Sequence, residues 1–275
     1  MRTLGRSTVR RRDAESPSTT VNGMTVVAIV DLDSTLVRGS YLFHFGLSLV
    51  RRRILNPRHL LTFVVAEARY VAHGTEPPGI PRRIAECVLD LVRGQDQSVL
   101  ADLCWRFVGD SLDRFIVPEV LVAIRDLQDL GIPVYIATAS PQELADAVAD
   151  HLRLSGAIGT VAEVRDGRYT GRLASPIAHG VDKLNRVREL FVELNADASR
   201  SWAFTDSIND LPLLSAVGWP VVVNGDERLR AVAKSKKWLT IDIGPHRANA
   251  LPISRWLRRS ARWLGDGPTV DVPMH

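Results

Sequence analysis

Short, continuous runs of apolar residues alternate along this chain with longer segments in which apolar residues recur every three or four positions. The first run, Met24–Val30, is rich in β-branched residues, as is typical of a strand buried on both faces of a parallel sheet. Similar runs follow at Pro133–Thr138, Ser201–Thr205 and Trp219–Val223. Segments with helical spacing occur at Pro118–Leu130, Gln142–Leu152 and Val181–Leu194. Strands that alternate with helices predict an α/β domain built on a parallel sheet.

One long segment interrupts the alternation. From about residue 41 to residue 113 no run predicts a strand, and apolar residues recur with helical spacing between turn signals such as Asn56-Pro57 and Pro77-Pro78-Gly79. We therefore expect an all-helical block, inserted after the first strand, that caps one edge of the sheet. Further along, the alternating residues of Val161–Leu173 around Asp166-Gly167 predict a β-hairpin.

Basic residues are concentrated at the two ends of the chain. The formal net charge is +4, but residues 1–23 and 246–275 each carry +3, which leaves −2 for residues 24–245. Residues 1–23 have no apolar period and predict a disordered leader. In residues 246–275, Leu251–Leu264 predicts a basic amphipathic helix, which either lies on an anionic membrane surface or docks on its own domain. Since the excess charge belongs to these ends, the folded body is not expected to bind nucleic acid.

The expected compartment is the cytoplasm. A hydrophobic fraction of 45% is ordinary for a globular protein, and no run approaches the 18 apolar residues that a membrane span needs. Polar residues 13–23 stand where a signal peptide would need an apolar region. Cys87 and Cys104 are expected to be free thiols in a reducing compartment, and a single disulfide between them is the alternative. If the C-terminal tail binds membrane, the protein would be a cytoplasmic protein attached peripherally to the membrane surface.

Acidic side chains follow the end of the first predicted strand, in Asp31-Leu32-Asp33-Ser34-Thr35-Leu36. Ligands of open α/β sheets bind beyond the carboxyl ends of the strands. Two carboxylates there are costly unless a cation neutralises them, and Mg²⁺ takes one or two carboxylates together with phosphate oxygens. Taken alone, the same residues would also suit a turn.

Three later features favour a phosphate site over a turn. Thr138 ends the second run and is followed by Ala139-Ser140-Pro141, which opens a helix, and amides at a helix N-terminus bind anions. Lys183 is one of only four lysines in the chain. A second acidic pair, Asp206 and Asp210, comes directly after the third run.

In this order the residues resemble the four motifs of the haloacid dehalogenase (HAD) superfamily. Asp31 to Leu36 look like the first motif, Thr138 the second, Lys183 the third, and Asp206 with Asp210 the fourth. The helical insertion is similar to the C1-type cap of the phosphoserine phosphatase-like hydrolases, subfamily IB. The resemblance covers about residues 24–240. It implies a Rossmann-like parallel-sheet core from residues 24–40 and 116–245, with residues 41–115 as the all-helical cap.

The resemblance also implies an enzyme that hydrolyses a phosphate monoester through an aspartyl-phosphate. Asp31 would be the nucleophile and Asp33 the general acid and base. Thr138 and Lys183 would stabilise the charge on the transferred group. Mg²⁺ would be held by Asp31, the Asp33 carbonyl and Asp206.

Three residues of the fourth motif are expected to support this site. Asp210 would orient Lys183 or a metal-bound water, Asn209 is a candidate contact to phosphate, and Ser207 lies beside them. Within the superfamily, an aspartate at position 33 favours phosphatase or phosphomutase over dehalogenase or ATPase. A non-catalytic binding module is the alternative from another class, and the complete set of motif residues argues against it.

The expected substrate is a small phosphorylated metabolite. Ser40 stands where phosphoserine phosphatases carry a glutamate for the substrate amino group, which argues against phosphoserine. Tyr41, Phe43 and His44 either line the entrance of the cap or pack in its interior. A lipid phosphate phosphatase at the membrane surface, a phosphoserine phosphatase and a phosphotransferase on the same scaffold remain alternatives.

Overall fold

The computed structural model describes residues 10–11, 20–21, 23–55 and 80–243, and a mostly parallel sheet organises them. The sheet has the strand order β1-β6-β5-β4-β9-β10-β11. These strands are β1 (Arg10–Arg11), β4 (Ala28–Val30), β5 (Val134–Pro141), β6 (Gly156–Thr160), β9 (Trp202–Thr205), β10 (Trp219–Val223) and β11 (Leu239–Ile241). Every pair is parallel except β1 with β6. The predicted α/β class is therefore confirmed.

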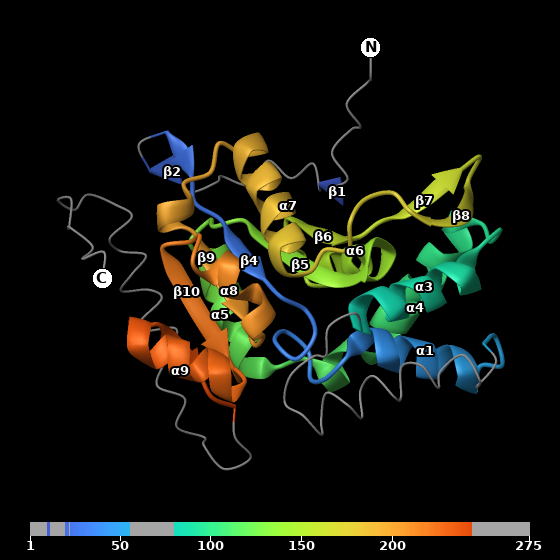
Figure 1. The fold of residues 1–275 in the computed structure, drawn as a ribbon, viewed down its shortest axis with the longest axis horizontal. Coiled ribbons are helices and arrows are strands. Elements are labelled where there is room, and N and C mark those ends of the chain that lie inside the picture. The colour runs from blue at the N-terminus through green and yellow to red at the C-terminus, as the bar shows by residue number, and fades with distance from the viewer. Residues whose placement is uncertain (1–9, 12–19, 22, 56–79, 244–275) are drawn as a thin grey trace.

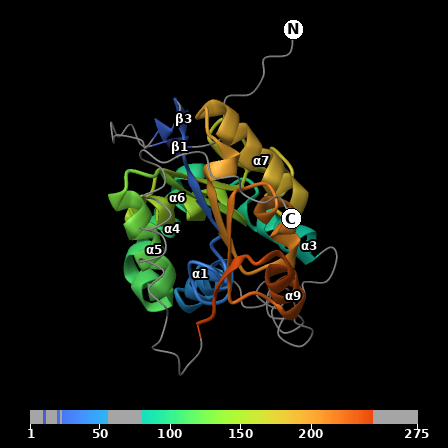
Figure 2. The same cartoon turned by 90° about the vertical axis from the view of Figure 1, so that its left-hand side faces the viewer.

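Alternate residues of β4 and the two residues before it enter two separate hydrophobic cores. Val26, Ala28 and Val30 pack with one set of helices, whereas Val27 and Ile29 pack with another. The first set is α4 (Gln97–Phe115), α5 (Pro118–Asp129) and α6 (Gln142–His151). The second set is α7 (Gly180–Glu193), α8 (Leu211–Leu214) and α9 (Glu227–Lys236). Figure 2 shows the sheet between these two layers, which explains why its central strand is apolar throughout.

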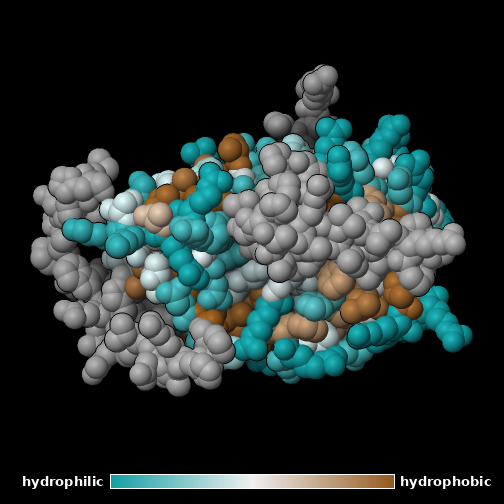
Figure 3. Space-filling model, turned by 60° about the horizontal axis from the view of Figure 1, so that its bottom comes forward, coloured by the Kyte–Doolittle hydropathy of each residue, from teal (hydrophilic) through white to brown (hydrophobic). Residues whose placement is uncertain are grey.

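The segment between β4 and α5 contains helices and no strand in its described part. These helices are α1 (Tyr41–Arg51), α3 (Ile80–Val92) and α4, and they lie together at one end of the molecule (Figure 1). Hydrophobic side chains show at the surface on this side (Figure 3). One face of α4 also packs into the main core through Phe107, Val108 and Leu112. A helical cap therefore covers the sheet edge, and its exact boundaries at 41 and 115 stay predictions.

The predicted hairpin is present and reaches the cap. It consists of β7 (Ala162–Arg165) and β8 (Arg168–Leu173), with Asp166 and Gly167 both at positive φ, 50° and 76°, as the tight hairpin turn requires. The backbone of Tyr169 exchanges two hydrogen bonds with the α3–α4 connection: Gly94 N donates to Tyr169 O at 2.8 Å, and Tyr169 N donates to Gln95 O at 3.0 Å. The hairpin thereby attaches the cap to the α/β body.

The first predicted strand, Met24–Val30, is shorter in the structure, because the neighbouring strands β5 and β9 pair with it only from Ala28 onward. Ala28 is the first residue with partners on both sides, Val134 and Trp202. The preceding residues Met24–Thr25 (β3) pair instead with Thr20–Val21 (β2). Strands β1 and β2 lie within residues 1–23, for which the sequence predicts a disordered leader, so these four residues differ from that prediction. The glycine-containing β6 and the three-residue β11 gave no apolar run long enough to be predicted.

Two predictions concern residues that the structure does not describe. Most of the leader and the whole of the tail 246–275 lie outside the described residues, so docking and membrane binding of the tail stay open. Among the helices that are described, none has the length and apolarity needed to span a membrane. Cys87 and Cys104 are not joined by a disulfide.

Gly159 provides a test of how β6 packs against the start of α6. A Cβ at this position would lie 2.7 Å from Gln142 Cα, a backbone contact that no side-chain rotation relieves. We expect Gly159→Ala to lower the free energy of unfolding by about 1–3 kcal/mol in urea titrations. Gly109→Ala is the matched control, because Gly109 is an exposed residue inside α4 with no atom within 4 Å of the added Cβ. That variant should gain about 0.5–1 kcal/mol, and equal stability of the two variants would contradict the packing described here.

Candidate active site

The carboxyl ends of three adjacent strands bring the predicted site residues together. Strands β5, β4 and β9 are neighbours in the sheet. Asp31 and Asp206 directly follow β4 and β9, and Thr138 lies within β5, three residues before its last residue. All three side chains are buried. Parallel strands place these ends at one edge, so residues more than 170 positions apart share a site.

Lys183 is buried between two carboxylates. Its Nζ donates to Asp31 Oδ1 at 2.9 Å and to Asp210 Oδ2 at 2.6 Å, and the three side chains are 4%, 10% and 3% exposed. The same Asp210 oxygen also accepts a hydrogen bond from Thr205 Oγ1 at 2.8 Å. Lys183 lies in the first turn of α7. Its two ion pairs therefore connect this helix to the end of β4 and to the segment after β9.

Burial and mutual repulsion dominate the electrostatics of this edge. Burial raises the pKa of Asp31 to about 7, with Lys183 opposing the shift and the charges of Asp210 and Asp33 adding to it. Burial and the charge of Asp31 also raise the pKa of Asp206 well above its usual range. Burial alone would lower the pKa of Lys183, but Asp210 and Asp31 raise it instead. Two buried carboxylates thus contact one ammonium while a third, Asp206, is affected by the charge of Asp31, and this concentration of negative charge favours a bound cation.

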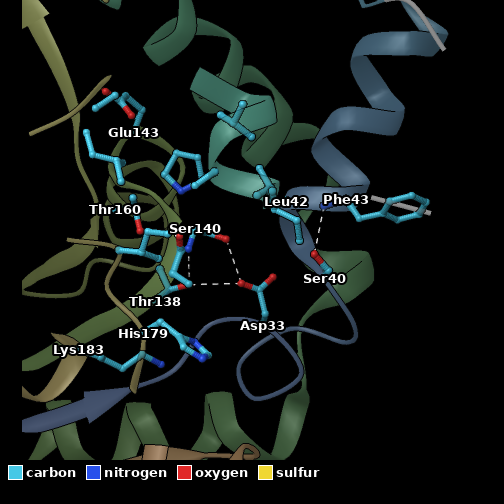
Figure 4. A pocket seen from close by; sticks show the side chains of 18 of the residues that line it. Asp33, Ser40, Leu42, Phe43, Thr138, Ser140, Glu143, Thr160, His179 and Lys183 are labelled. Atoms are coloured by element: carbon cyan, nitrogen blue, oxygen red, sulfur yellow. Dashed lines mark hydrogen bonds between the residues drawn. The ribbon is translucent and has the colours of Figure 1, made fainter. Parts of the chain in front are cut away.

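Asp33 does not join this cluster but turns toward the hydroxyl groups at the end of β5. Its Oδ2 accepts hydrogen bonds from Ser140 Oγ at 3.0 Å and Thr138 Oγ1 at 3.3 Å (Figure 4). Its Oδ1 accepts from the backbone N–H of Tyr41, the first residue of α1, at 2.6 Å. Burial raises the pKa of Asp33, although these three hydrogen bonds act in the opposite direction. A carboxyl group with a raised pKa suits a proton donor.

A tight loop after β4 places Asp33 and Thr35 on opposite sides. Ser34 has φ 58° and Gly39 has φ 68°, and Ser34 N donates to Gly39 O at 3.0 Å. A non-glycine residue at positive φ costs energy and persists where its surroundings hold it. Thr35 Oγ1 donates to Asp206 Oδ1 at 3.0 Å, while Arg38 N donates to Phe115 O at 2.8 Å. The loop is therefore fastened both to the fourth motif and to the end of α4.

The donors at this edge suit a hard divalent cation. Asp31 and Asp206 are buried carboxylates that repel each other, and Asp210 Oδ1 is buried without a hydrogen-bond partner. Within the described residues no three His, Cys, Asp or Glu side chains cluster in a way that could hold a metal. The Asp33 carboxylate points elsewhere, so the predicted set depends on two side chains and the Asp33 carbonyl. Such oxygen donors fit Mg²⁺, which keeps several waters and takes one or two carboxylates.

These groups open into a cavity of about 220 Å³ between the sheet edge and the cap. The end of the cavity at the sheet edge is polar, and its lining side chains include Asp31, Asp33, Thr138, Lys183 and Asp206. Ser40 and Phe43 of the predicted cap residues also line it. Figure 4 shows Asp33, Thr138, Ser140, His179 and Lys183 close together, with Leu42 on the α1 side and Glu143 at the far end.

Two of the predicted cap residues do not line the cavity. The Tyr41 side chain is fully buried, with its ring 4.9 Å from Phe107 and its hydroxyl 3.1 Å from Ser111 Oγ. His44 stacks on Phe115 at 4.0 Å between ring centroids. Because α1 turns these two side chains toward α4, they pack the cap against the core, which is the second of the two alternatives that the sequence left open for them.

The supporting residues of the fourth motif shape the backbone. Ser207 lines the cavity, and its Oγ accepts from Asn209 N at 3.2 Å at the start of the short 3-10 helix η2 (Ile208–Asp210). Asn209 is not among the cavity residues, so its contact to phosphate stays a prediction. Its carbonyl lies 3.5 Å from where a Cβ on Gly180 would be, next to the first turn of α7.

Three further residues belong to the site and were not assigned roles from the sequence. Ser140 holds Asp33, Thr35 holds Asp206, and His179 lines the cavity as the residue before α7. Period-two alternation along an extended strand could have revealed Ser140, because it shares a face with Thr138. No comparable sequence signal distinguishes Thr35 or His179.

Known proteins with similar sequence or fold show the family to which the chain belongs. The family model of haloacid dehalogenase-like hydrolases matches residues 28–215. A phosphoserine phosphatase of Mycobacterium tuberculosis is 37% identical over 220 residues, which make up 78% of this chain and 70% of that protein.

Two solved structures share the fold. A protein of unknown function from Bordetella pertussis is 26% identical, with a TM-score of 0.69 over 80% of this chain and 99% of that one. A probable phosphoserine phosphatase from Vibrio cholerae is 15% identical, with a TM-score of 0.56 over 86% and 65% of the two chains. Since the family model covers more than half of the sequence, the chain belongs to the haloacid dehalogenase-like hydrolases, as a phosphatase of that family.

Proposed function

We propose that the protein is a Mg²⁺-dependent phosphatase that hydrolyses a phosphate monoester through an aspartyl-phosphate on Asp31. The observation that carries the proposal is that the two carboxylates of the first motif, Asp31 and Asp33, have different partners. Asp31 is ion-paired to Lys183, whereas Asp33 is held by Ser140, Thr138 and the N-terminus of α1 with a raised pKa. One carboxylate is kept for attack and the other for proton transfer.

In the first step, an Asp31 oxygen attacks phosphorus and the bond to the substrate alcohol breaks. Asp33 gives its proton to the departing oxygen, so the alcohol leaves neutral. In the second step, Asp33 takes a proton from a water molecule that attacks the phosphoryl group, which releases inorganic phosphate and restores Asp31. Lys183 and the hydroxyl of Thr138 stabilise the charge on the phosphoryl oxygens.

Asp31, Asp206 and the Asp33 carbonyl are the groups that would hold Mg²⁺. When bound, the ion supplies positive charge that offsets the repulsion between carboxylate and phosphate and polarises the phosphoryl group. Asp210 keeps Lys183 in place at 2.6 Å. The proposed compartment is the cytoplasm, where small phosphorylated metabolites are available.

Phosphoserine is the alternative substrate, because a relative with 37% identity is a phosphoserine phosphatase. Ser40 does not supply a carboxylate for a substrate ammonium, and its hydroxyl accepts a hydrogen bond from Phe43 N at 3.3 Å as the N-cap of α1. Position 40 therefore offers no carboxylate for a substrate ammonium. A general phosphomonoesterase activity is the better supported proposal.

Replacing the nucleophile tests the reaction itself. We expect Asp31→Asn to lower Mg²⁺-dependent phosphate release from p-nitrophenyl phosphate by about 10³-fold or more, because the amide cannot form the phosphoenzyme. Release should also stop when Mg²⁺ is removed with a chelator. Asp129→Asn is the matched control, since Asp129 is exposed at the end of α5 and should keep full activity. Full activity of Asp31→Asn would refute the proposed mechanism.

The role of Asp33 predicts a dependence on the leaving group. For Asp33→Asn we expect a loss of about 10²–10⁴-fold with an alkyl phosphate, whose alcohol needs a proton to leave. The first step with p-nitrophenyl phosphate should survive better, because p-nitrophenolate leaves without one. Rapid mixing should then show a stoichiometric burst of p-nitrophenolate before slow turnover. Equal losses on both substrates without a burst would show that Asp33 does not transfer the proton.

The buried ion pairs predict a stability effect that is separate from catalysis. Lys183→Met leaves Asp31 and Asp210 buried without their cation, and removing one partner of such a pair costs about 3–5 kcal/mol. Urea unfolding at neutral pH measures this loss. Lys234→Met, at an exposed position of α9, serves as the control and should leave stability nearly unchanged. A Lys183→Met protein as stable as the wild type would contradict the ion-pair geometry.

A further inference from the structure

The cavity has two ends of opposite character, and the proposed reaction uses only one of them. Its polar end lies at the sheet edge, where phosphate would be bound. The other end is enclosed by apolar residues from both the cap and the body, namely Leu42, Ile84, Ala85, Val88, Leu89, Val92, Leu100, Ala162, Leu173 and Ile177. The substrate alcohol has to occupy this second end once its phosphate lies beside Asp31.

Helix α3 supplies the largest share of the apolar wall. Ile84, Val88 and Val92 recur at four-residue spacing, which places them along one face of the helix. All three remain only half-buried in the structure, although the neighbouring Leu89 is buried. A helix face that is apolar and still accessible from the cavity gains free energy when an apolar group covers it.

Among the described residues that line this part of the cavity, none has a cationic side chain that could bind an ionised substrate carboxylate. Of the described residues that line the cavity as a whole, only Lys183 is a lysine or arginine, and it lies at the polar end, ion-paired to Asp31 and Asp210. The polar pair at the far end, Glu143 and Tyr169, is internally satisfied, since Tyr169 OH donates to Glu143 Oε1 at 2.6 Å. A negatively charged Glu143 would repel a carboxylate rather than bind it.

We propose that the alcohol part of the substrate is apolar, so that the enzyme acts on phosphate monoesters of an alkyl or aromatic alcohol in preference to phosphoserine. This inference rests on the proposed function and specifies its substrate class. Phosphate and the apolar group would bind at opposite ends of one cavity, the first by charge and the second by burial against α3.

A series of short alkyl phosphates tests the proposal. We expect kcat/KM to rise from ethyl through propyl to hexyl phosphate by about fourfold for each buried methylene, until the cavity is full. Phenyl and naphthyl phosphate test whether a ring or a chain fits better. 2-Aminoethyl phosphate, nearly isosteric with propyl phosphate, and phosphoserine should both be poorer substrates. A preference for either charged ester over propyl phosphate would overturn the inference and point to Glu143 as an ammonium site.

Substitutions in the wall locate the effect. Val88→Asp should reduce the ratio of kcat/KM for hexyl over propyl phosphate at least tenfold, and Val88→Thr should change it in the same direction by a smaller factor. The threonine variant keeps the test valid if the aspartate variant does not fold. Val192→Asp is the control, because Val192 is 82% exposed on α7, and it should leave the ratio unchanged. An unchanged ratio in both Val88 variants would show that α3 does not contact the alcohol.

Binding of alkylphosphonates, which cannot be hydrolysed, separates this inference from the proposed function. Calorimetry with Mg²⁺ present should show hexylphosphonate binding more tightly than propylphosphonate by the same factor per methylene. Hydrolysis with a preference for phosphoserine would overturn the inference and leave the phosphatase standing. Tight binding of hexylphosphonate without hydrolysis of any ester would overturn the phosphatase and leave the apolar site standing.

Discussion

The ion pairs of Lys183 are the interaction on which the rest of the site depends. A buried ammonium and two buried carboxylates are costly to remove from water, and their mutual attraction offsets that cost only when the geometry is close. Here Nζ lies within 2.9 Å of both carboxylates, so α7 has a fixed position relative to β4 and to the segment after β9. Asp210 Oδ1 is buried without a hydrogen-bond partner, and burial together with the charge of Asp31 raises the pKa of Asp206 well above its usual range. This excess of buried negative charge supports the proposed binding of a divalent cation and of the phosphate group that it would accompany.

The position of Asp33 links this charged edge to the cap. Its carboxylate accepts a hydrogen bond from the first N–H of α1, where the helix dipole favours negative charge, and from two hydroxyls at the end of β5. The acid is therefore placed jointly by cap and body. Any movement of α1 relative to β5 would change both its position and its pKa. The packing of Tyr41 and His44 against α4 keeps α1 in place, so of the two roles that the sequence left open for these residues the structure shows the packing role.

The sequence predicted those features that depend on strong local patterns. Apolar runs identified β5, β9 and β10, and the carboxyl-end rule of parallel sheets brought Asp31, Thr138 and Asp206 to one edge. It did not predict β6 or β11, because two glycines in the first and a length of three residues in the second leave no clear period. Nor could it predict which face of α1 meets the cavity, since Tyr41, Phe43 and His44 are all aromatic. Such a choice is made by tertiary contacts, here with Phe107 and Phe115, which a local pattern does not contain.

In the proposed reaction the two ends of the cavity have different roles, since the polar end would bind the phosphoryl group and the apolar end the alcohol. Residues at the strand ends need only recognise a phosphoryl group, and their arrangement says nothing about the alcohol. In the proposed reaction the alcohol lies between the cap and the hairpin β7–β8, which meet at the backbone hydrogen bonds between Tyr169 and the α3–α4 connection. A relative can therefore share more than a third of its residues, together with the reaction, and still select a different alcohol. Of the residues that line the apolar end, those on α3 say most about the chemistry of the substrate alcohol. A helix with one apolar face exposed to a cavity is stabilised by an apolar ligand that covers this face.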